Sequence, residues 1–362
     1  MWKPKCRVLT MSILTLVLTG IIMVGSSSRV WAKFKFHDPY YFMSRQAIFA
    51  VLGLAVMYVF SKIDLQRLRK YAKPLFYFCV LLLILVLIPG LGVQRNGSRS
   101  WFGAGSFLIQ PSEFFKIAII IYIADFLAKR YRVKTFMKDL LRPAMATMLG
   151  FGLILLQPDF GSGIVMVCSI VVMVLAADSP LHYFVRVGFL GAVGLGGLII
   201  SAPYRLARIT SFVNPWKDPL GSGFQIIQSL FAIAPGGILG VGFDQSMQKN
   251  FYLPEPQTDF IFAIFAEEFG FIGCALLISV FLLVIYEGVK IAKQCVDPYL
   301  SYVAIGLIAL FAIQVMINLG VVVGLFPVTG ITLPFISYGG SSLMVMMGSM
   351  GLLISIANSS YD

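Results

Sequence analysis

Two carboxylates, Glu255 and Asp259, end a long semi-polar stretch and come directly before an apolar run. The stretch ends Phe251-Tyr-Leu-Pro-Glu-Pro-Gln-Thr-Asp259, and the apolar run continues to residue 285 with early interruptions at Glu267 and Glu268. A carboxylate at the mouth of a membrane helix costs free energy to hold there, so such a residue usually has a function. Asp259 is therefore the first candidate for chemistry, with Glu255 beside it. The later glutamates project about 100° apart on a helix, so at most one of them faces a given groove well.

A second charged group, Glu113 and Lys116, opens another apolar run at residues 111–129. Residues three apart share one face of a helix. An isolated charge at mid-membrane costs about 2.5–3.5 kcal/mol on insertion scales, and pairing lowers that cost. The two side chains are either a mutually satisfied structural pair or the lining of a polar, outward-open cavity. We favour the cavity because the pair follows a loop on the same predicted side as Asp259.

Three further segments hold residues that suit an anionic substrate. Arg95 and Arg99 lie in one loop, where arginine suits bidentate phosphate recognition or simply contact with headgroups. Asp159, in the tight turn Gln157-Pro-Asp-Phe-Gly161, could cap the next helix or line the cavity. Tyr338-Gly-Gly-Ser-Ser342 reads as a turn that opens the last helix, with Ser341 or Ser342 near its cap. A helix N-terminus favours an anion, although a plain cap is the alternative.

The composition excludes an ordinary soluble enzyme. The chain is 59% hydrophobic and 12% charged, whereas soluble domains have about twice that share of charge. The net charge of +12 does not require a nucleic-acid partner, because most basic residues lie in short loops between apolar runs. The sequence contains no Walker motif, Ser-His-Asp set or zinc-ligand spacing.

The positioning elements are membrane spans, and we predict an all-α, polytopic membrane protein with a single integral membrane domain over residues 1–362. Apolar runs of about 18 or more residues are candidate spans. Ten are predicted, at residues 8–28, 45–61, 74–92, 111–129, 143–159, 160–178, 183–202, 260–286, 300–325 and 339–357. One large extracytoplasmic loop, 203–259, separates spans seven and eight, and within it residues 224–233 have the pattern of an interfacial helix.

The distribution of lysine and arginine predicts the orientation. With a cytoplasmic N-terminus, the inner segments carry 17 of the 28 basic residues and the outer segments carry 10. This bias favours both termini in the cytoplasm of a cell whose cytoplasmic membrane the protein spans. Asp259 then lies on the outer face, where nucleotide-activated sugars are not normally available. A lipid-linked pyrophosphoryl sugar, which carries its own activation, fits the predicted cavity.

Seven motifs in order along nearly the whole chain resemble the SEDS family (shape, elongation, division and sporulation). They are Asn96-Gly-Ser-Arg-Ser-Trp101, Gln110-Pro-Ser-Glu-Phe-Phe-Lys116, Gln157-Pro-Asp-Phe-Gly161, Asn214-Pro-Trp-Lys-Asp-Pro219, Tyr252-Leu-Pro-Glu-Pro-Gln-Thr-Asp-Phe-Ile-Phe262, Glu267-Glu-Phe-Gly270 and Leu333-Pro-Phe-Ile-Ser-Tyr-Gly-Gly-Ser-Ser342. The Pro254–Asp259 wording and the short tails are most similar to the family's sporulation branch or to close relatives in its division branch. One departure is Gly25-Ser-Ser-Ser28, where the family has a Tyr-Ser-Ala-Ser-like stretch. We expect no effect of it on the polar motifs.

The resemblance implies ten spans and a peptidoglycan glycosyltransferase that polymerises lipid II into undecaprenyl-pyrophosphate-linked glycan. It implies a partner, a class B penicillin-binding protein that cross-links the strands, beside the surrounding membrane lipids. Asp259 matches the family's catalytic aspartate, and a divalent cation (Mg or Mn) near it has family support. The substrate-binding candidates that lie in the matching motifs are Arg99, Glu113, Lys116, Asp159, Glu255, Ser337 and Ser341.

Two other functions stay open at this stage. A transporter that flips lipid II would also use charges in or beside spans, such as Glu113, Lys116 and Asp125. Against it, the sequence shows no inverted repeat, and its polar motifs cluster on the outer side. A pure scaffold for a transpeptidase is a weaker interpretation, since it does not need the outer carboxylates.

Overall fold

The computed structural model describes residues 6–95, 97–104, 107–129, 139–180, 191, 196–197 and 212–359. The seventh predicted span, 183–202, lies almost entirely outside the described residues. The described helices are α1 (Arg7–Phe36), α2 (Tyr41–Phe60), α3 (Leu65–Lys70), α4 (Ala72–Leu85), α5 (Pro111–Ala128), α6 (Leu141–Leu156), α7 (Phe160–Ala176), the short 3₁₀ helix η3 (Pro215–Lys217), α10 (Phe224–Gly236), α11 (Ile261–Gln294), α12 (Pro298–Val322) and α13 (Gly340–Ser359).

Local sequence signals set where several of these helices begin. Asp297 precedes α12 and accepts a hydrogen bond from the backbone N–H of Tyr299 (2.8 Å), and Pro298 occupies the first helical position. Asp159 caps α7 in the same way, through the N–H of Ser162 (3.1 Å). Such caps satisfy donors that a helix N-terminus leaves unpaired. The helix starts therefore agree closely with the sequence prediction.

The predicted spans correspond to helices wherever the chain is described. Among the described residues, five helices are long and apolar enough to cross a membrane: α1, α2, α11, α12 and α13. The helices α4, α6 and α7 are shorter, and α5 has the length but carries Glu113, Lys116 and Asp125. The predicted third span ends early, because α4 stops at Leu85 and turns follow. The total of ten spans stays a prediction.

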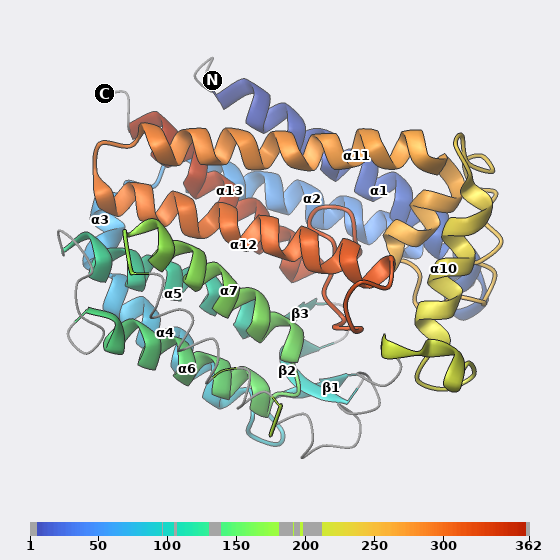
Figure 1. Cartoon of the computed structure of the whole chain (residues 1–362), viewed down its shortest axis with the longest axis horizontal. Helices are drawn as coiled ribbons and strands as arrows, with labels where there is room; N and C mark the ends of the chain where they lie inside the picture. The colour runs from blue at the N-terminus through green and yellow to red at the C-terminus, as the bar shows by residue number, and fades with distance from the viewer. Residues whose placement is uncertain are drawn as a thin grey trace.

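The helices run roughly along one long axis, with different features at the two ends (Figure 1). α1 begins and α13 ends at the end that holds α3, while α10 and a small sheet lie at the other end. The thiol of Cys6 contacts Asn358 (4.0 Å), which places the start of α1 beside the end of α13. This shared end agrees with an even number of crossings. We call the end that holds α10 the outer end of the bundle, after the orientation that the distribution of lysine and arginine predicts.

α12 and α13 form the centre of the bundle, and α2 and α11 lie at its edge. In the most apolar 18-residue stretch of each helix, 78% of the residues of α12 and 83% of those of α13 are buried, against 33% for α2 and 22% for α11. Large apolar side chains of α11, such as Leu276 and Tyr286, are exposed. Apolar side chains that face outward suit contact with lipid. Most residues of α12 are therefore enclosed by protein, although Met316 is 56% exposed.

A three-stranded antiparallel sheet, which the all-α prediction did not include, occupies the predicted second outer loop. Its strands are β1 (Val93–Arg95), β2 (Ser98–Ala104) and β3 (Phe107–Ile109), in the order β1-β2-β3. Trp101 pairs with Val93, and Phe102 pairs with Ile109. β1 and β3 have three residues each, too few for an alternation pattern to predict them. They lead directly into α5.

α11 is interrupted at Gly270, and the interruption makes room for the loop after α10. Gly270 has φ 62° and ψ −164°, a backbone conformation that residues other than glycine rarely adopt. A Cβ there would lie 2.3 Å from the backbone nitrogen of Gly240. The N–H of Phe271 donates to the carbonyl of Gly237 (2.9 Å) across this contact. The predicted helix within the large loop is thus confirmed as α10, which packs against α11.

Candidate active site

Asp259 lies at the outer end of the bundle, two residues before α11 begins. Its side chain is half-buried. The hydroxyl of Thr258 lies 2.9 Å from Asp259 Oδ1 and 2.8 Å from the carbonyl oxygen of Glu255. Glu255 has φ 45°, a strained conformation for a residue with a side chain. Strain of this kind persists only where surrounding contacts enforce it, and it is concentrated at functional sites.

The loop that follows α12 holds the residues between Glu255 and Asp259. Ser337 donates its hydroxyl to the carbonyl of Thr258 (2.6 Å) and accepts from the N–H of Leu333 (2.8 Å). The N–H of Tyr338 donates to the carbonyl of Gln257 (2.8 Å). The predicted substrate ligand Ser337 is 4% exposed. The structure therefore gives it a bracing role between two loops, and its contact with substrate stays a prediction.

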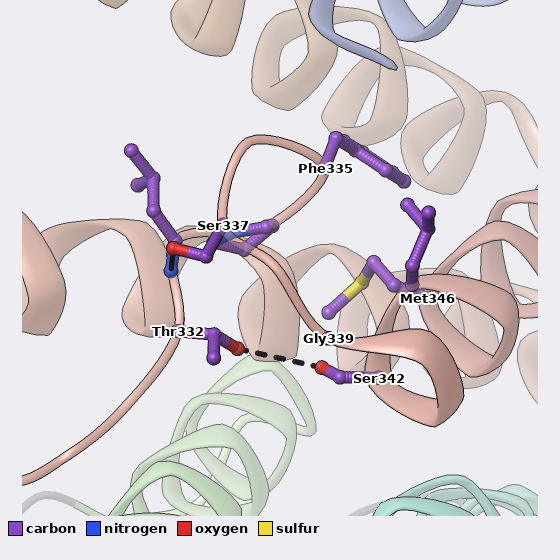
Figure 2. A pocket seen from close by; sticks show the side chains of 9 residues that line it. Thr332, Phe335, Ser337, Gly339, Ser342 and Met346 are labelled. Carbon is purple, nitrogen blue, oxygen red and sulfur yellow. Dashed lines mark hydrogen bonds between the residues drawn. The ribbon is translucent and has the colours of Figure 1, made fainter. Parts of the chain in front are cut away.

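A small hollow lies between this loop and the start of α13 (Figure 2). The hydroxyls of Thr332 and Ser342 point toward one another across it, 3.5 Å apart, and Met346 closes one side. Ser341 lies next to the hollow in sequence; it is buried, and its hydroxyl has no hydrogen-bond partner within the part of the chain that the structure describes. A buried hydroxyl without a partner is costly. Ser341 is therefore available to a water or a ligand.

Glu113 and Lys116 form the predicted pair. Lys116 Nζ lies 2.8 Å from Glu113 Oε1, and their side chains are 2% and 7% exposed. Asp159 adjoins α5, because its second carboxylate oxygen accepts from Nε2 of Gln110 (2.7 Å), the residue directly before that helix. Asp159 is thus the cap of α7, as one alternative predicted. Its place in the lining of a cavity stays a prediction.

The pair and Asp259 belong to one connected region. A Cβ on Gly161, in the first turn of α7, would lie 2.8 Å from the carbonyl oxygen of Thr329 and 2.7 Å from Ile331. The carbonyl of Ile331 in turn accepts from Asn318, which also bonds the backbone of Asp259. The cluster at Asp159 therefore touches the same loop that holds the candidate catalytic residue.

Arg99 lies apart from this region. It sits on β2 with a long contact from its guanidinium to the carbonyl of Leu87 (3.5 Å), and its Nε is buried without a hydrogen-bond partner among the described residues. No contact joins it to Asp259 within those residues. Its role in phosphate binding stays a prediction. The guanidinium has free donors with which to meet an anion.

Sequence reasoning missed two groups of residues. The first comprises the buried amides Gln46 and Asn318, which bond the carbonyls of Ser337, Asp259 and Ile331. Polar side chains inside apolar helices commonly hydrogen-bond across elements, so an amide within a predicted span was the available signal.

The second group is a buried ionic network at the outer end. Lys249 Nζ lies 2.5 Å from Asp244 and 3.2 Å from Glu268, and Asp244 also pairs with Arg29. Ser26 donates to Glu268 (2.6 Å), so the expectation that the departure at residues 25–28 leaves the polar motifs untouched was wrong. Ser26 occupies a buried position on α1 that faces α11.

Both glutamates of α11 hold the same loop, from two directions. Glu267 accepts from the hydroxyl of Ser246 (2.5 Å) and the N–H of Met247 (2.8 Å). Glu268 bonds Lys249 instead. The two side chains thus bond different residues, and the prediction that at most one of them faces a given groove stays a prediction.

A divalent cation would find few protein ligands near Asp259. Among the described residues, no group of three or more His, Cys, Asp or Glu side chains could hold a metal ion. Mg²⁺ commonly binds one or two carboxylates and completes its shell with substrate phosphates and water. Asp259, half-buried and at the open end of the bundle, fits such a shared site.

The chain belongs to the FtsW/RodA/SpoVE family. The model of this family, described as cell cycle protein, matches residues 7–362. The stage V sporulation protein E of Bacillus subtilis (strain 168) is 51% identical over 357 residues, covering 98% of each chain. A probable peptidoglycan glycosyltransferase FtsW of Geobacter metallireducens is 40% identical over 351 residues, covering 97% of this chain and 94% of the relative.

Solved structures of the family agree with the fold. A chain of the structure described as "Structural coordination of polymerization and crosslinking by a peptidoglycan synthase complex" has a TM-score of 0.83 and 31% identity, covering 98% of both chains. The rod shape determining protein RodA of Thermus thermophilus has a TM-score of 0.73 and 27% identity, covering 98% of this chain and 97% of that one. The predicted resemblance to the sporulation and division branches is confirmed, and this chain is a multi-pass membrane protein.

Proposed function

We propose that this protein is a peptidoglycan glycosyltransferase that polymerises lipid II on the outer face of the cytoplasmic membrane. The observation that carries the proposal is Asp259, a half-buried carboxylate at the outer end of the bundle whose backbone and side chain are both held by hydrogen bonds. The names of the relatives, a sporulation protein and a probable peptidoglycan glycosyltransferase, support the same activity. Both termini are then cytoplasmic.

Asp259 acts as a general base in this proposal. It accepts the proton of the acceptor sugar hydroxyl while that oxygen attacks the anomeric carbon of the pyrophosphate-linked strand. The bond from that carbon to the pyrophosphate oxygen breaks, and the lipid pyrophosphate leaves with the electron pair. A positioned base contributes about 10²–10⁴-fold to a rate. Because the attack is direct, the configuration inverts and no covalent glycosyl-enzyme forms.

The departing pyrophosphate needs positive charge. A bound Mg²⁺ or Mn²⁺ at Asp259 would neutralise part of it. Lys116 lies in the connected region but is buried against Glu113. In this conformation its ammonium group acts on the pyrophosphate only through its electrostatic field and does not bond it directly. Glu113, Asp159, Glu255, Ser337 and Ser341 are the further residues that we assign to the substrate cavity, and we assign Arg99, on β2, to phosphate binding.

The proposed partner is a class B penicillin-binding protein. The related solved chain belongs to a peptidoglycan synthase complex that coordinates polymerisation and crosslinking. A strand made at the outer end of the bundle emerges on the side where a transpeptidase would cross-link it.

The test is polymerisation of lipid II by the purified protein with its partner. Asp259→Asn should lower strand synthesis by at least about 10²-fold, the lower bound for loss of a positioned base. Asp218→Asn is the matched control, because the carboxylate of Asp218 is exposed in the same loop and accepts its side-chain hydrogen bonds from the N–H and hydroxyl of Ser222. Near-normal synthesis by folded Asp259→Asn would refute the assignment. Translocation of fluorescent lipid II in vesicles without polymer would favour a transporter instead.

A further inference from the structure

Asn318 is a buried amide on the central helix α12, and it bonds the backbone of the candidate base directly. The side chain is 1% exposed. Its Nδ2 lies 2.8 Å from the carbonyl oxygen of Asp259 and 2.7 Å from that of Ile331. One amide group therefore joins two loops. Asp259 lies 59 residues before Asn318 in the chain, and Ile331 lies 13 residues after it. Neither carbonyl belongs to a regular helix or strand.

The place of the Asp259 carboxylate depends on these backbone bonds. The residue precedes α11 and lies outside the regular helix. Its side chain is bonded by Thr258, the neighbouring residue, and Thr258 is itself held through its carbonyl by Ser337. Ser337 lies on a loop, whereas Asn318 projects from a helix. A site supported by a rigid element is more precise than one supported by a loop alone.

α12 is suited to this supporting role. It packs against α11, α7 and α5, the helices that carry or adjoin Asp259 and the Glu113–Lys116 pair. Leucine or another apolar residue would serve equally well for packing at a buried position of a membrane helix. The amide costs free energy to bury and is retained with two good hydrogen bonds. Packing alone does not explain it.

We propose that Asn318 is a positioning residue for the glycosyl transfer: its amide fixes the backbone of Asp259, and with it the reach of the carboxylate toward the acceptor hydroxyl. This inference rests on the proposed role of Asp259 as base. Asn318 does not touch substrate in this assignment. It also links the position of Asp259 to the 329–339 loop, so a shift of that loop moves the base.

Gln314 provides a matched control within the same helix. It lies one turn before Asn318, is 2% exposed, and donates its Nε2 to the carbonyl of Thr332 (3.1 Å). Both amides thus bond the loop after α12, and only Asn318 also bonds Asp259 among the described contacts. Loss of either amide removes a hydrogen bond to a backbone carbonyl of a loop. Of the two, only loss of Asn318 removes a bond to the backbone of Asp259.

The experiment compares Asn318→Leu and Gln314→Met in full-length protein with its partner, measuring kcat and KM for lipid II and the melting temperature. A displacement of about 1 Å costs on the order of 10²-fold in rate. We expect Asn318→Leu to lower kcat by about that factor with little change in KM, and Gln314→Met to lower it less than about threefold, with similar melting temperatures. If the leucine variant does not accumulate, Asn318→Ser replaces it, since its hydroxyl can bond one of the two carbonyls.

A double variant separates positioning from general damage. Residues that act as a unit are strongly non-additive in their effects on rate. Asn318→Leu should therefore lower the rate no further when Asp259 is already asparagine. A kcat of Asn318→Leu as high as that of Gln314→Met, a loss confined to KM, or a multiplied loss in the double variant would overturn the inference. Full activity of Asp259→Asn alone would instead refute the proposed function of that residue.

Discussion

Two charged clusters of the described structure differ in how far apart their members lie in the chain. The first is the local pair, Glu113 and Lys116, which lies within the first two turns of α5. The second is the outer network, defined as Arg29, Asp244, Lys249 and Glu268 with the Ser26 hydroxyl. The local pair needs only a helix to form. The outer network needs α1, α11 and the loop between α10 and α11 to meet.

The two clusters therefore differ in whether they help to position Asp259. The outer network anchors the loop whose continuation carries Asp259, since Lys249 and Asp259 are ten residues apart. The local pair lies in the connected region without fixing any loop. Removal of a buried partner, Lys116 from the local pair or Lys249 from the outer network, leaves an unpaired buried charge, which is strongly destabilising. The variants below compare the two clusters.

The largest effect is expected for Lys249→Met in the outer network. This change leaves Glu268, whose side chain is fully buried, and Asp244 without the ammonium that bonds both. Breaking a buried pair typically costs about 3–5 kcal/mol, and here two carboxylates lose one cation. The melting temperature in detergent should fall clearly, whereas Lys217→Met, an exposed lysine of η3, should leave it unchanged. Equal melting temperatures for the two variants would show that the network adds no stability.

A smaller loss is expected for Lys116→Met in the local pair. Glu113 lies in the first turn of α5, where the helix dipole favours a negative charge by up to about 1 kcal/mol. The double variant Glu113→Gln with Lys116→Met should be more stable than the single one, because it leaves no unpaired charge. Neither variant should regain strand synthesis if the cavity needs Lys116.

Yield, melting temperature and polymerisation rate of both variants check this prediction. A double variant as unstable as the single one would contradict the pairing. Full activity of the double variant would show that the local pair is structural only, and would sharpen the contrast with the outer network.

The smallest effect is expected at the edge of the outer network, for Arg29→Ala. Arg29 and Asp244 have half-exposed side chains, 48% and 26%, and exposed pairs contribute about 0–1 kcal/mol. Partial burial opposes ionisation of Asp244, but the hydrogen bonds and charges of Lys249 and Arg29 outweigh it, so its pKa is lowered.

The sign of the pH dependence follows from that lowered pKa. The stabilisation is present above the pKa of an unfolded aspartate, about 3.9, and is lost as the pH falls through the lower folded value. The small difference between wild type and Arg29→Ala should therefore persist from pH 7 to about pH 4 and disappear at more acidic pH. Thermal melts across this pH range measure the difference in stability between wild type and Arg29→Ala. Arg67→Ala, which removes one partner of the exposed pair Arg67–Asp64, is the control. A difference that grows on acidification would contradict the assignment.

The sequence by itself determined the features that depend on neighbouring residues. Apolar runs predicted the helices, the three-residue spacing predicted the pair of Glu113 and Lys116, and the carboxylate before an apolar run singled out Asp259. Asp159 before α7 was recognisable as a cap candidate for the same reason. Hydrophobicity, helix periodicity and capping act over a few residues, so a single chain segment contains all the information that they need.

Only the tertiary structure decided which distant groups meet. Ser26 bonds Glu268 across 242 residues, and Gln46 bonds the carbonyl of Ser337 across 291. Asn318 reaches Asp259 because α12 passes behind the start of α11. In a helix that is apolar on all sides, periodicity does not show which face meets which neighbour. The partners of these buried polar groups therefore follow from the packing of whole helices, and with them the precise place of the carboxylate that the sequence had already marked.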